Sequence, residues 1–181
     1  MNIWGRILKL VGWKVDITAK WQPKALICVA PHTSNWDFIL GLSAYRSLGR
    51  KANFLMKEFW FFFPLKYLLK SLGGIPVPKK GSGGTLTESL IKMIDKADYI
   101  NLAVTPEGTR SPRAEWRKGF LYISIGAKVP IQLGVIDYKR KCVMIHDEFT
   151  PTGDIENDMR FVKEYYAKYR DAARYPQKFK L

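Results

Sequence analysis

Two stretches of the sequence carry side chains that could together perform acid–base chemistry, and the first holds a histidine and an aspartate. His32, one of only two histidines, stands five residues before Asp37. A neutral imidazole can take a proton from a hydroxyl while a carboxylate holds its other ring nitrogen. Five residues along one continuous helix turn through about 140°, which would point the two side chains apart. They can meet only if the chain bends, and residues 33–35, Thr-Ser-Asn, allow that bend.

A purely structural role is the alternative for this stretch. His32 would then hydrogen-bond within its own loop, while Asp37 would cap the helix that follows. The stretch lies between an apolar run at 25–30, typical of a buried strand, and a periodic apolar run at 36–48, typical of a helix. Both hypotheses stay open on these residues alone.

The second stretch holds Glu107, Gly108, Thr109 and Arg110, shortly after an apolar run at 99–104. Loops at the carboxyl ends of parallel strands carry ligand sites in α/β proteins. The planar guanidinium of Arg110 matches a phosphate bidentately and therefore predicts a phosphate clamp. The alternative is that Glu107 and Arg110 form a surface ion pair without a function.

Alternating apolar runs and amphipathic stretches predict the elements that position these loops. Strands are expected at 25–30, 53–56, 99–104, 131–136 and 141–145, and helices at 3–13, 36–48, 85–96, 119–127 and 154–174. Crossovers of this length allow parallel pairing. The sequence therefore predicts a single α/β domain over residues 1–181, with a mostly parallel central sheet flanked by helices. Residues 1–24 are its N-terminal amphipathic helix and connector, and the last two strands are candidates for antiparallel pairing.

Two apolar segments could face either the core or a membrane. At 3–13 the apolar side chains fall on one arc of a helix, which suits a membrane interface or packing on the domain. The segment 57–70 is strongly aromatic, and Pro64 breaks or kinks any helix there. Burial in the core is the favoured interpretation for this segment, with contact to lipid or to an acyl chain as the alternative.

The composition indicates a folded chain with an anionic partner. Of the 181 residues 47% are hydrophobic, and the formal net charge is +14. Such a charge favours nucleic acid, an anionic membrane surface or phosphorylated small molecules. No nucleic-acid recognition motif is found, and two cysteines are too few for a disulfide framework, so both are expected to be buried thiols. No apolar run reaches the roughly 18–20 residues of a membrane-spanning helix, and no signal peptide is expected.

The ordered set of motifs resembles the phospholipid/glycerol acyltransferase family, which includes the 1-acyl-sn-glycerol-3-phosphate acyltransferases. The matching blocks are His-x4-Asp at 32–37, Gly-x-Ile-Pro-Val at 73–77, Pro-Glu-Gly-Thr-Arg-Ser at 106–111 and Val-Pro-Ile at 129–131. The chain departs from the family pattern at Pro31, where Asn is frequent, and at Pro78-Lys79, where Asp-Arg is frequent. These departures concern the head-group specificity more than the reaction class.

The resemblance implies a fold like that of glycerol-3-phosphate acyltransferase and a role in membrane phospholipid biosynthesis. A fatty acyl group would move from acyl-CoA or acyl-ACP to a hydroxyl of a lysophospholipid or glycerol phosphate. His32 would act as general base with Asp37 as its partner, and neither a bound cofactor nor a metal is expected. The stretch from Glu107 to Arg110 would bind substrate.

Further site residues are implied by the same resemblance. Lys79 and Lys118 would add positive charge around the phosphate, and Glu107 would position Arg110 or hydrogen-bond the acceptor. The backbone N–H groups of Gly74 and Ile75 are candidates for stabilising the tetrahedral oxyanion.

The expected partners are an anionic membrane surface, the lysolipid or glycerol-phosphate acceptor and, if it carries the acyl group, acyl carrier protein. The expected location is cytoplasmic, peripherally associated with the inner face of the cell membrane, and no nucleic acid is expected to bind. Two alternatives remain: an acyltransferase for an acceptor without phosphate, such as an ornithine- or glycine-type lipid, and a non-catalytic peripheral lipid-binding protein. A lipase or thioesterase is disfavoured because the chain has no Gly-x-Ser-x-Gly sequence.

Overall fold

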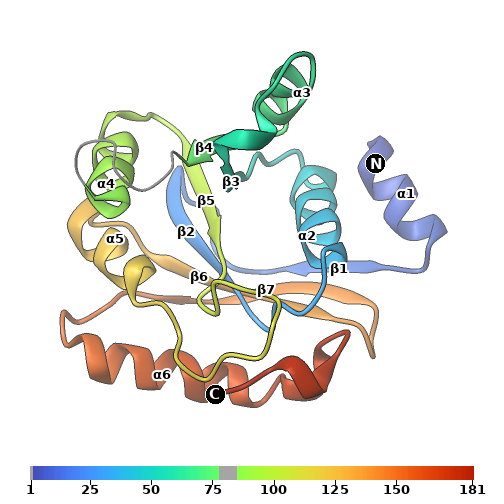
Figure 1. Cartoon of the computed structure of the whole chain (residues 1–181). Helices are drawn as coiled ribbons and strands as arrows, with labels where there is room; N and C mark the ends of the chain where they lie inside the picture. Colours follow the sequence, from blue (N-terminus) through green and yellow to red (C-terminus); the bar gives the residue numbers. More distant parts are fainter. Residues whose placement is uncertain (1, 78–84) are drawn as a thin grey trace.

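Seven strands form one sheet in the computed structural model, which describes residues 2–77 and 85–181. Their order across the sheet is β1-β7-β6-β2-β5-β3-β4 (Figure 1). The strands are β1 (Lys14–Ile17), β2 (Lys24–Val29), β3 (Asn53–Lys57), β4 (Gly74–Val77), β5 (Ile100–Val104), β6 (Ile131–Asp137) and β7 (Cys142–Phe149). All neighbours pair in parallel except β6 and β7. The predicted α/β class and mostly parallel sheet are confirmed.

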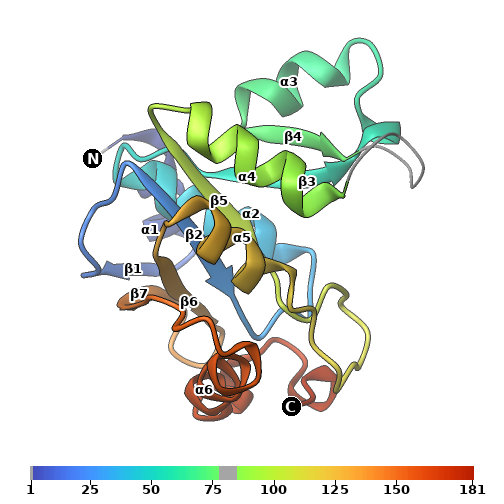
Figure 2. The ribbon, with the colours of Figure 1, turned by 90° about the vertical axis from the view of Figure 1, so that its left-hand side faces the viewer.

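Helices cover both faces of this sheet. They are α1 (Ile3–Leu10), α2 (Trp36–Ser47), α3 (Leu65–Ser71), α4 (Leu86–Lys96), α5 (Gly119–Ala127) and α6 (Ile155–Ala167). The larger core cluster joins α4, α5 and α6 to one face, while α1 and α2 pack on the other (Figures 1 and 2). Strand β2 lies between these layers, and its Leu26 and Cys28 have no exposed surface. Residues that leave β2 therefore start from a strand that is packed on both faces.

The last helix is shorter than predicted. The sequence indicated a helix over 154–174, but α6 ends at Ala167 and short 3₁₀ turns follow at Arg170–Ala172 and Pro176–Lys178. The chain tightens there into bonds three residues apart, such as the one from the N–H of Ala172 to the carbonyl of Tyr169 at 2.9 Å. This tightening turns the segment away from the axis of α6, with consequences for the site described below.

Helix α1 packs on the domain through only part of its surface. Leu8 is buried against Leu40 and Ala44 of α2. Trp4 is partly buried, and four other apolar side chains of the arc stay exposed, namely Ile3, Ile7, Leu10 and Val11. Packing therefore accounts for one side of the helix and leaves the other open. Among the described residues, no helix combines the length and the apolar character that crossing a bilayer requires.

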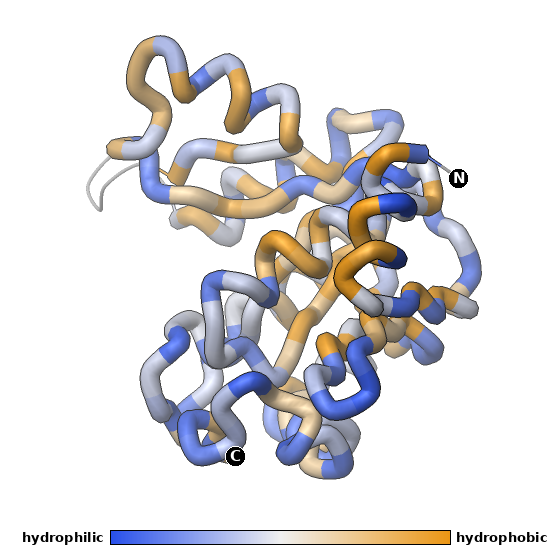
Figure 3. Tube along the Cα trace, turned by 90° about the vertical axis from the view of Figure 1, so that its right-hand side faces the viewer, coloured by the Kyte–Doolittle hydropathy of each residue, from blue (hydrophilic) through white to orange (hydrophobic). Residues whose placement is uncertain are grey.

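The aromatic segment 59–68 is not core, contrary to the favoured interpretation. A 3₁₀ turn at Glu58–Trp60 and helix α3 carry it past β4, the edge strand of the sheet (Figure 2). Phe59 and Phe63 are 76% and 75% exposed, and within α3 only Leu69 is buried. Figure 3 displays hydrophobic residues recurring along α3 as well as α1. The prediction was wrong: these rings lie beside the edge strand of the sheet, where they stay open to solvent.

Candidate active site

The loop between β2 and α2 brings His32 and Asp37 together as the bend at 33–35 predicted. Nδ1 of His32 lies 3.2 Å from Oδ2 of Asp37, whose side chain is almost fully buried in the first turn of α2. The same oxygen accepts hydrogen bonds from the N–H groups of Thr33 at 2.9 Å and Ser34 at 3.0 Å. These two bonds fold the loop back over the start of the helix. Asp37 thus organises the loop and also faces the histidine, so the two hypotheses are compatible.

The His32 ring is held with one nitrogen inward. Nδ1 is buried, and its alignment with the carboxylate falls short of a hydrogen bond in this structure. The side chain is 14% exposed, so solvent reaches it through its other ring atoms. Catalytic hydrogen bonds are often long or poorly aligned without substrate and tighten when it binds.

Tyr138, which follows β6, holds the other oxygen of Asp37. Its hydroxyl donates to Oδ1 at 2.6 Å. Burial first, and then the hydrogen bond and negative charge of Asp37, raise the pKa of Tyr138 well above its usual range, so the hydroxyl keeps its proton. Sequence reasoning missed this residue because it stands about a hundred positions after Asp37 and belongs to no motif.

Glu107 supports the backbone of the same loop. Strands β2 and β5 are parallel neighbours, so the loops that follow them meet at one edge of the sheet, as expected. Oε1 of Glu107 accepts a hydrogen bond from the N–H of His32 at 2.6 Å, and the residue is only 1% exposed. No ion pair between Glu107 and Arg110 occurs in the described part of the chain. Glu107 therefore holds the backbone of His32, and the expected role of positioning Arg110 gains no support from this contact.

The carboxyl group of Glu107 is electrostatically unusual. Burial raises its pKa from 4.5 to about 7; the negative charge of Asp37 adds to this, and the hydrogen bond from His32 opposes it. Asp37 faces the imidazole of His32, while Glu107 contacts the backbone N–H of the same residue. That arrangement suits a histidine that becomes positively charged during a reaction.

The turn after β5 depends on its glycine. Gly108 has φ +64° and donates its N–H to the carbonyl of Thr105 at 3.0 Å. A Cβ there would lie 3.0 Å from Cγ of Arg117, so both conformation and space favour glycine. Thr109 accepts a hydrogen bond from the N–H of Ser111 and so shapes the same turn. Arg110 follows as an exposed side chain.

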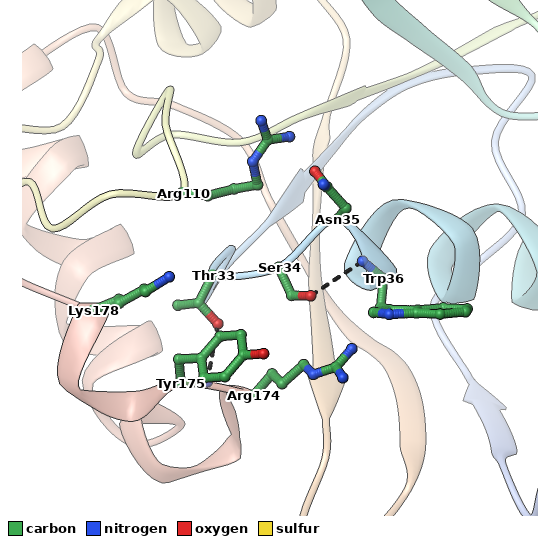
Figure 4. Close-up of a pocket in the computed structure, with 8 residues that line it drawn as sticks. All are labelled: Thr33, Ser34, Asn35, Trp36, Arg110, Arg174, Tyr175 and Lys178. Carbon is green, nitrogen blue, oxygen red and sulfur yellow. Dashed lines mark hydrogen bonds between the residues drawn. The ribbon is translucent and has the colours of Figure 1, made fainter.

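Arg110 lines an open pocket of about 310 Å³ directly beside the histidine loop (Figure 4). The pocket is lined by Thr33, Ser34, Asn35, Trp36, Arg110, Arg174, Tyr175 and Lys178. Arg174 and Lys178 were not expected here, because the sequence predicted that a helix would run through residue 174. Only the turn after α6 brings them to this edge.

The other predicted cations lie elsewhere. Lys118 stands at the start of α5 and is ion-paired with Glu156 of α6, so it does not line the pocket. Lys79 lies outside the described residues. The cationic character of the pocket in the described part of the chain thus comes from two arginines and a different lysine.

Gly74 and Ile75 are not brought to His32. They begin β4, which is separated from β2 by β5 and β3, about 14 Å away at the usual strand spacing. The glycines of this block have a packing reason: a Cβ on Gly73 would lie 2.2 Å from the carbonyl oxygen of Ala52, and one on Gly74 would lie 2.8 Å from that of Leu69. Their placement gives no support to a role as oxyanion donors.

A comparison of the sequence with protein families finds a match to the acyltransferase family over residues 14–135. The chain belongs to the acyltransferase family. No curated protein matches the chain. The matched region contains His32, Asp37, Glu107 and Arg110, while Tyr138 and the pocket residues after α6 lie beyond it. Family membership gives acyl transfer as the general reaction of this acyltransferase. Within the described residues, no group of three or more His, Cys, Asp or Glu side chains could hold a metal ion.

Proposed function

We propose that this acyltransferase moves a fatty acyl group from an acyl thioester, carried by coenzyme A or acyl carrier protein, to a hydroxyl of a lysophospholipid or glycerol phosphate in membrane phospholipid biosynthesis. The observation that carries the proposal is the 3.2 Å approach of His32 Nδ1 to the buried Asp37 carboxylate. It is supported by the cationic pocket that adjoins the same loop.

In the proposed mechanism His32 removes the proton of the acceptor hydroxyl as its oxygen attacks the thioester carbonyl. A hydroxyl has a pKa far above neutrality and needs such a base at the moment of attack. The tetrahedral intermediate then collapses, the carbon–sulfur bond breaks, and the thiolate leaves and takes the proton from the imidazolium. Asp37 stabilises the positive ring between these two proton transfers. Tyr138 and the N–H groups of Thr33 and Ser34 keep that carboxylate in place.

The acceptor and donor are expected at an anionic membrane surface, at the inner face of the cell membrane. The aromatic segment 59–68 follows β3, which is parallel to β5, so it leaves the same edge of the sheet as the histidine loop. Lys57, Lys66 and Lys70 accompany its exposed rings, with Glu58 as the one acidic residue in 57–70. Basic residues near an anionic bilayer contribute about 1 kcal/mol each, and exposed aromatic clusters mark interaction surfaces.

An acyl-thioester consumption assay with a panel of acceptors tests the proposal. His32→Ala should lower the rate by about 10²–10⁴-fold, the usual contribution of a positioned general base. His146→Ala is the matched control, because this other histidine lies on β7 and pairs with Asp16 at 2.9 Å. Wild-type activity that survives in His32→Ala would contradict the mechanism.

The panel also distinguishes the alternatives. Turnover with an acceptor that lacks phosphate, and none with lysophosphatidic acid or glycerol 3-phosphate, would favour an ornithine- or glycine-type lipid. No turnover with any acceptor, together with binding to lipid vesicles, would favour the non-catalytic lipid-binding protein.

A further inference from the structure

We propose that the segment 170–180, after α6, completes a phosphate-binding pocket in which Arg174 and Lys178 act together with Arg110. This inference rests on the proposed function, because it assumes that the reaction is acyl transfer. It names a segment of the chain that would select a phosphorylated substrate for that reaction. Arg174 and Lys178 lie beyond the region matched by the family, which ends at residue 135. They are features of this chain that the family match does not assign.

The pocket walls come from three separate parts of the chain. In Figure 4, Arg110 reaches the site from the loop after β5, and Arg174, Tyr175 and Lys178 reach it from the segment after α6. The backbone of Thr33 and Ser34, directly after His32, runs between the two groups. A phosphate held among these cations would lie beside the loop that carries the base. At about 310 Å³ the pocket is at the small end of the range of small-molecule sites, roughly 300–1,000 Å³.

The three cations are not neutralised by the protein. None of them pairs with a carboxylate within 4.0 Å in the described part of the chain, and residues 78–84 contain no Asp or Glu. No acidic side chain is among the described residues that line the pocket. Unpaired cations that line one open pocket favour an anionic ligand.

Aromatic rings orient two of these cations. The guanidinium carbon of Arg174 lies 5.9 Å from the ring centres of Trp36 and Tyr138 and 5.6 Å from that of Tyr175. Nζ of Lys178 lies 4.8 Å from the Tyr175 ring. Such contacts hold a positive charge without cancelling it. The charges are therefore positioned before a ligand arrives.

The segment that carries these cations is anchored at each end and in the middle. The N–H of Tyr138 donates to the carbonyl of Ala172 at 2.8 Å, and the N–H of Tyr175 donates to Oγ1 of Thr33 at 3.2 Å. Nε1 of Trp116 donates to the carbonyl of Lys180 at 2.9 Å, and Phe179 is 1% exposed in the core. The middle anchor fastens the segment to the residue that follows His32.

The ligand chemistry is a phosphate group, and two sources could supply it. One is the phosphomonoester of glycerol 3-phosphate or lysophosphatidic acid, and the other is the phosphate groups of coenzyme A. Guanidinium and ammonium groups bind either through charge-assisted hydrogen bonds. The experiment therefore needs one arm for each source.

Calorimetric titration of the full chain measures the binding without any turnover. The acceptor arm compares glycerol 3-phosphate with glycerol, and the donor arm compares coenzyme A with pantetheine. Arg174→Gln and Lys178→Gln should each weaken the binding of glycerol 3-phosphate, of coenzyme A or of both. The expected loss is about ten- to hundredfold, the usual effect of losing a hydrogen bond to a charged group. Arg160→Gln, an exposed arginine on α6 that does not line the pocket, should bind as the wild type does. Thermal melting of each variant checks that it is folded.

The outcomes separate this inference from the proposed function. The arm in which Arg174→Gln loses affinity identifies the source of the phosphate. Weakened phosphate binding in an enzyme that transfers no acyl group would keep the pocket and reject the reaction. Acyl transfer with unchanged phosphate affinity and KM in folded Arg174→Gln and Lys178→Gln would reject the pocket and keep the reaction. The inference would be overturned if the wild type bound glycerol 3-phosphate no more tightly than glycerol, and coenzyme A no more tightly than pantetheine.

Discussion

Two segments leave the carboxyl ends of parallel strands in this sheet, and they treat their side chains in opposite ways. After β2, the histidine loop buries polar groups: Asp37 is 3% and Glu107 1% exposed, and each accepts hydrogen bonds from the loop. After β3, the aromatic segment 59–68 exposes large apolar rings. A buried carboxylate is costly unless hydrogen bonds hold it, while a cluster of exposed rings marks a surface for a partner. The first segment fixes the geometry of its side chains, and the second is the one that we propose contacts a partner.

Loss of charge at Asp37 should have the largest effect. Asp37→Asn keeps the shape of the side chain but removes the negative charge that stabilises the imidazolium, so kcat/KM should fall about 10³–10⁴-fold. Asp158→Asn is the matched control, because Asp158 is also buried and accepts N–H bonds from the loop before α6, yet contacts no histidine. The control should lose stability and keep its turnover per folded molecule. Equal losses of kcat/KM in both variants would mean that Asp37 acts through the stability of the fold and not through its charge beside His32.

Glu107 should make the stability of the protein depend on pH. Its pKa of about 7 in the folded chain lies above the ordinary 4.5, so the folded state binds the proton more tightly. Stability therefore falls as the pH rises from about 4.5 through 7, by at most about 3 kcal/mol. Glu107→Gln removes this contribution.

The measurement is urea unfolding of wild type and variants between pH 4.5 and 8. The free energy of unfolding of the wild type relative to Glu107→Gln should decline across this range. Glu164→Gln, which replaces an exposed glutamate on α6, is the control for the loss of a glutamate at the surface. A flat difference for Glu107→Gln would mean that the carboxyl group is charged throughout and that burial does not control it.

The aromatic segment should show the opposite behaviour, with an effect on membrane binding and none on stability. The double variant Phe59→Ser/Phe63→Ser removes two highly exposed rings. Its partition onto phosphatidylglycerol vesicles should fall at least tenfold, since burying a Phe side chain contributes about 1.5–3 kcal/mol. The free energy of unfolding should change by less than about 0.5 kcal/mol. Tyr122→Ser, an exposed aromatic residue on α5, is the control that should keep its vesicle binding.

The sequence was enough to predict the histidine loop, and it was not enough to predict the position of the aromatic segment 59–68. The spacing of His32 and Asp37, with turn residues between them, was enough to predict that their side chains meet. The expected parallel pairing of the strands was enough to predict that Glu107 lies at the same edge of the sheet. The position of 59–68 could not be predicted, because hydrophobicity alone does not distinguish a core segment from one that runs beside the edge strand of the sheet. Tyr138 and Arg174 come from distant parts of the chain and belong to no motif, so only tertiary packing places them at the site.

Removing the hydroxyl of Tyr138 should have the smallest effect of these changes. It tests whether the hydrogen bond to Asp37 contributes to the rate. Tyr138→Phe keeps the ring contact with Trp13 but removes the hydroxyl that donates to Asp37 at 2.6 Å. Loss of one hydrogen bond to a charged group should lower kcat about tenfold while leaving KM for the thioester near its wild-type value. Without this donor the carboxylate is no longer fixed in the orientation that faces Nδ1 of His32, which accounts for the lower kcat. A purely structural role would lower the free energy of unfolding and leave kcat per folded molecule unchanged, and Tyr138 would then belong to the packing of the loop and not to its chemistry.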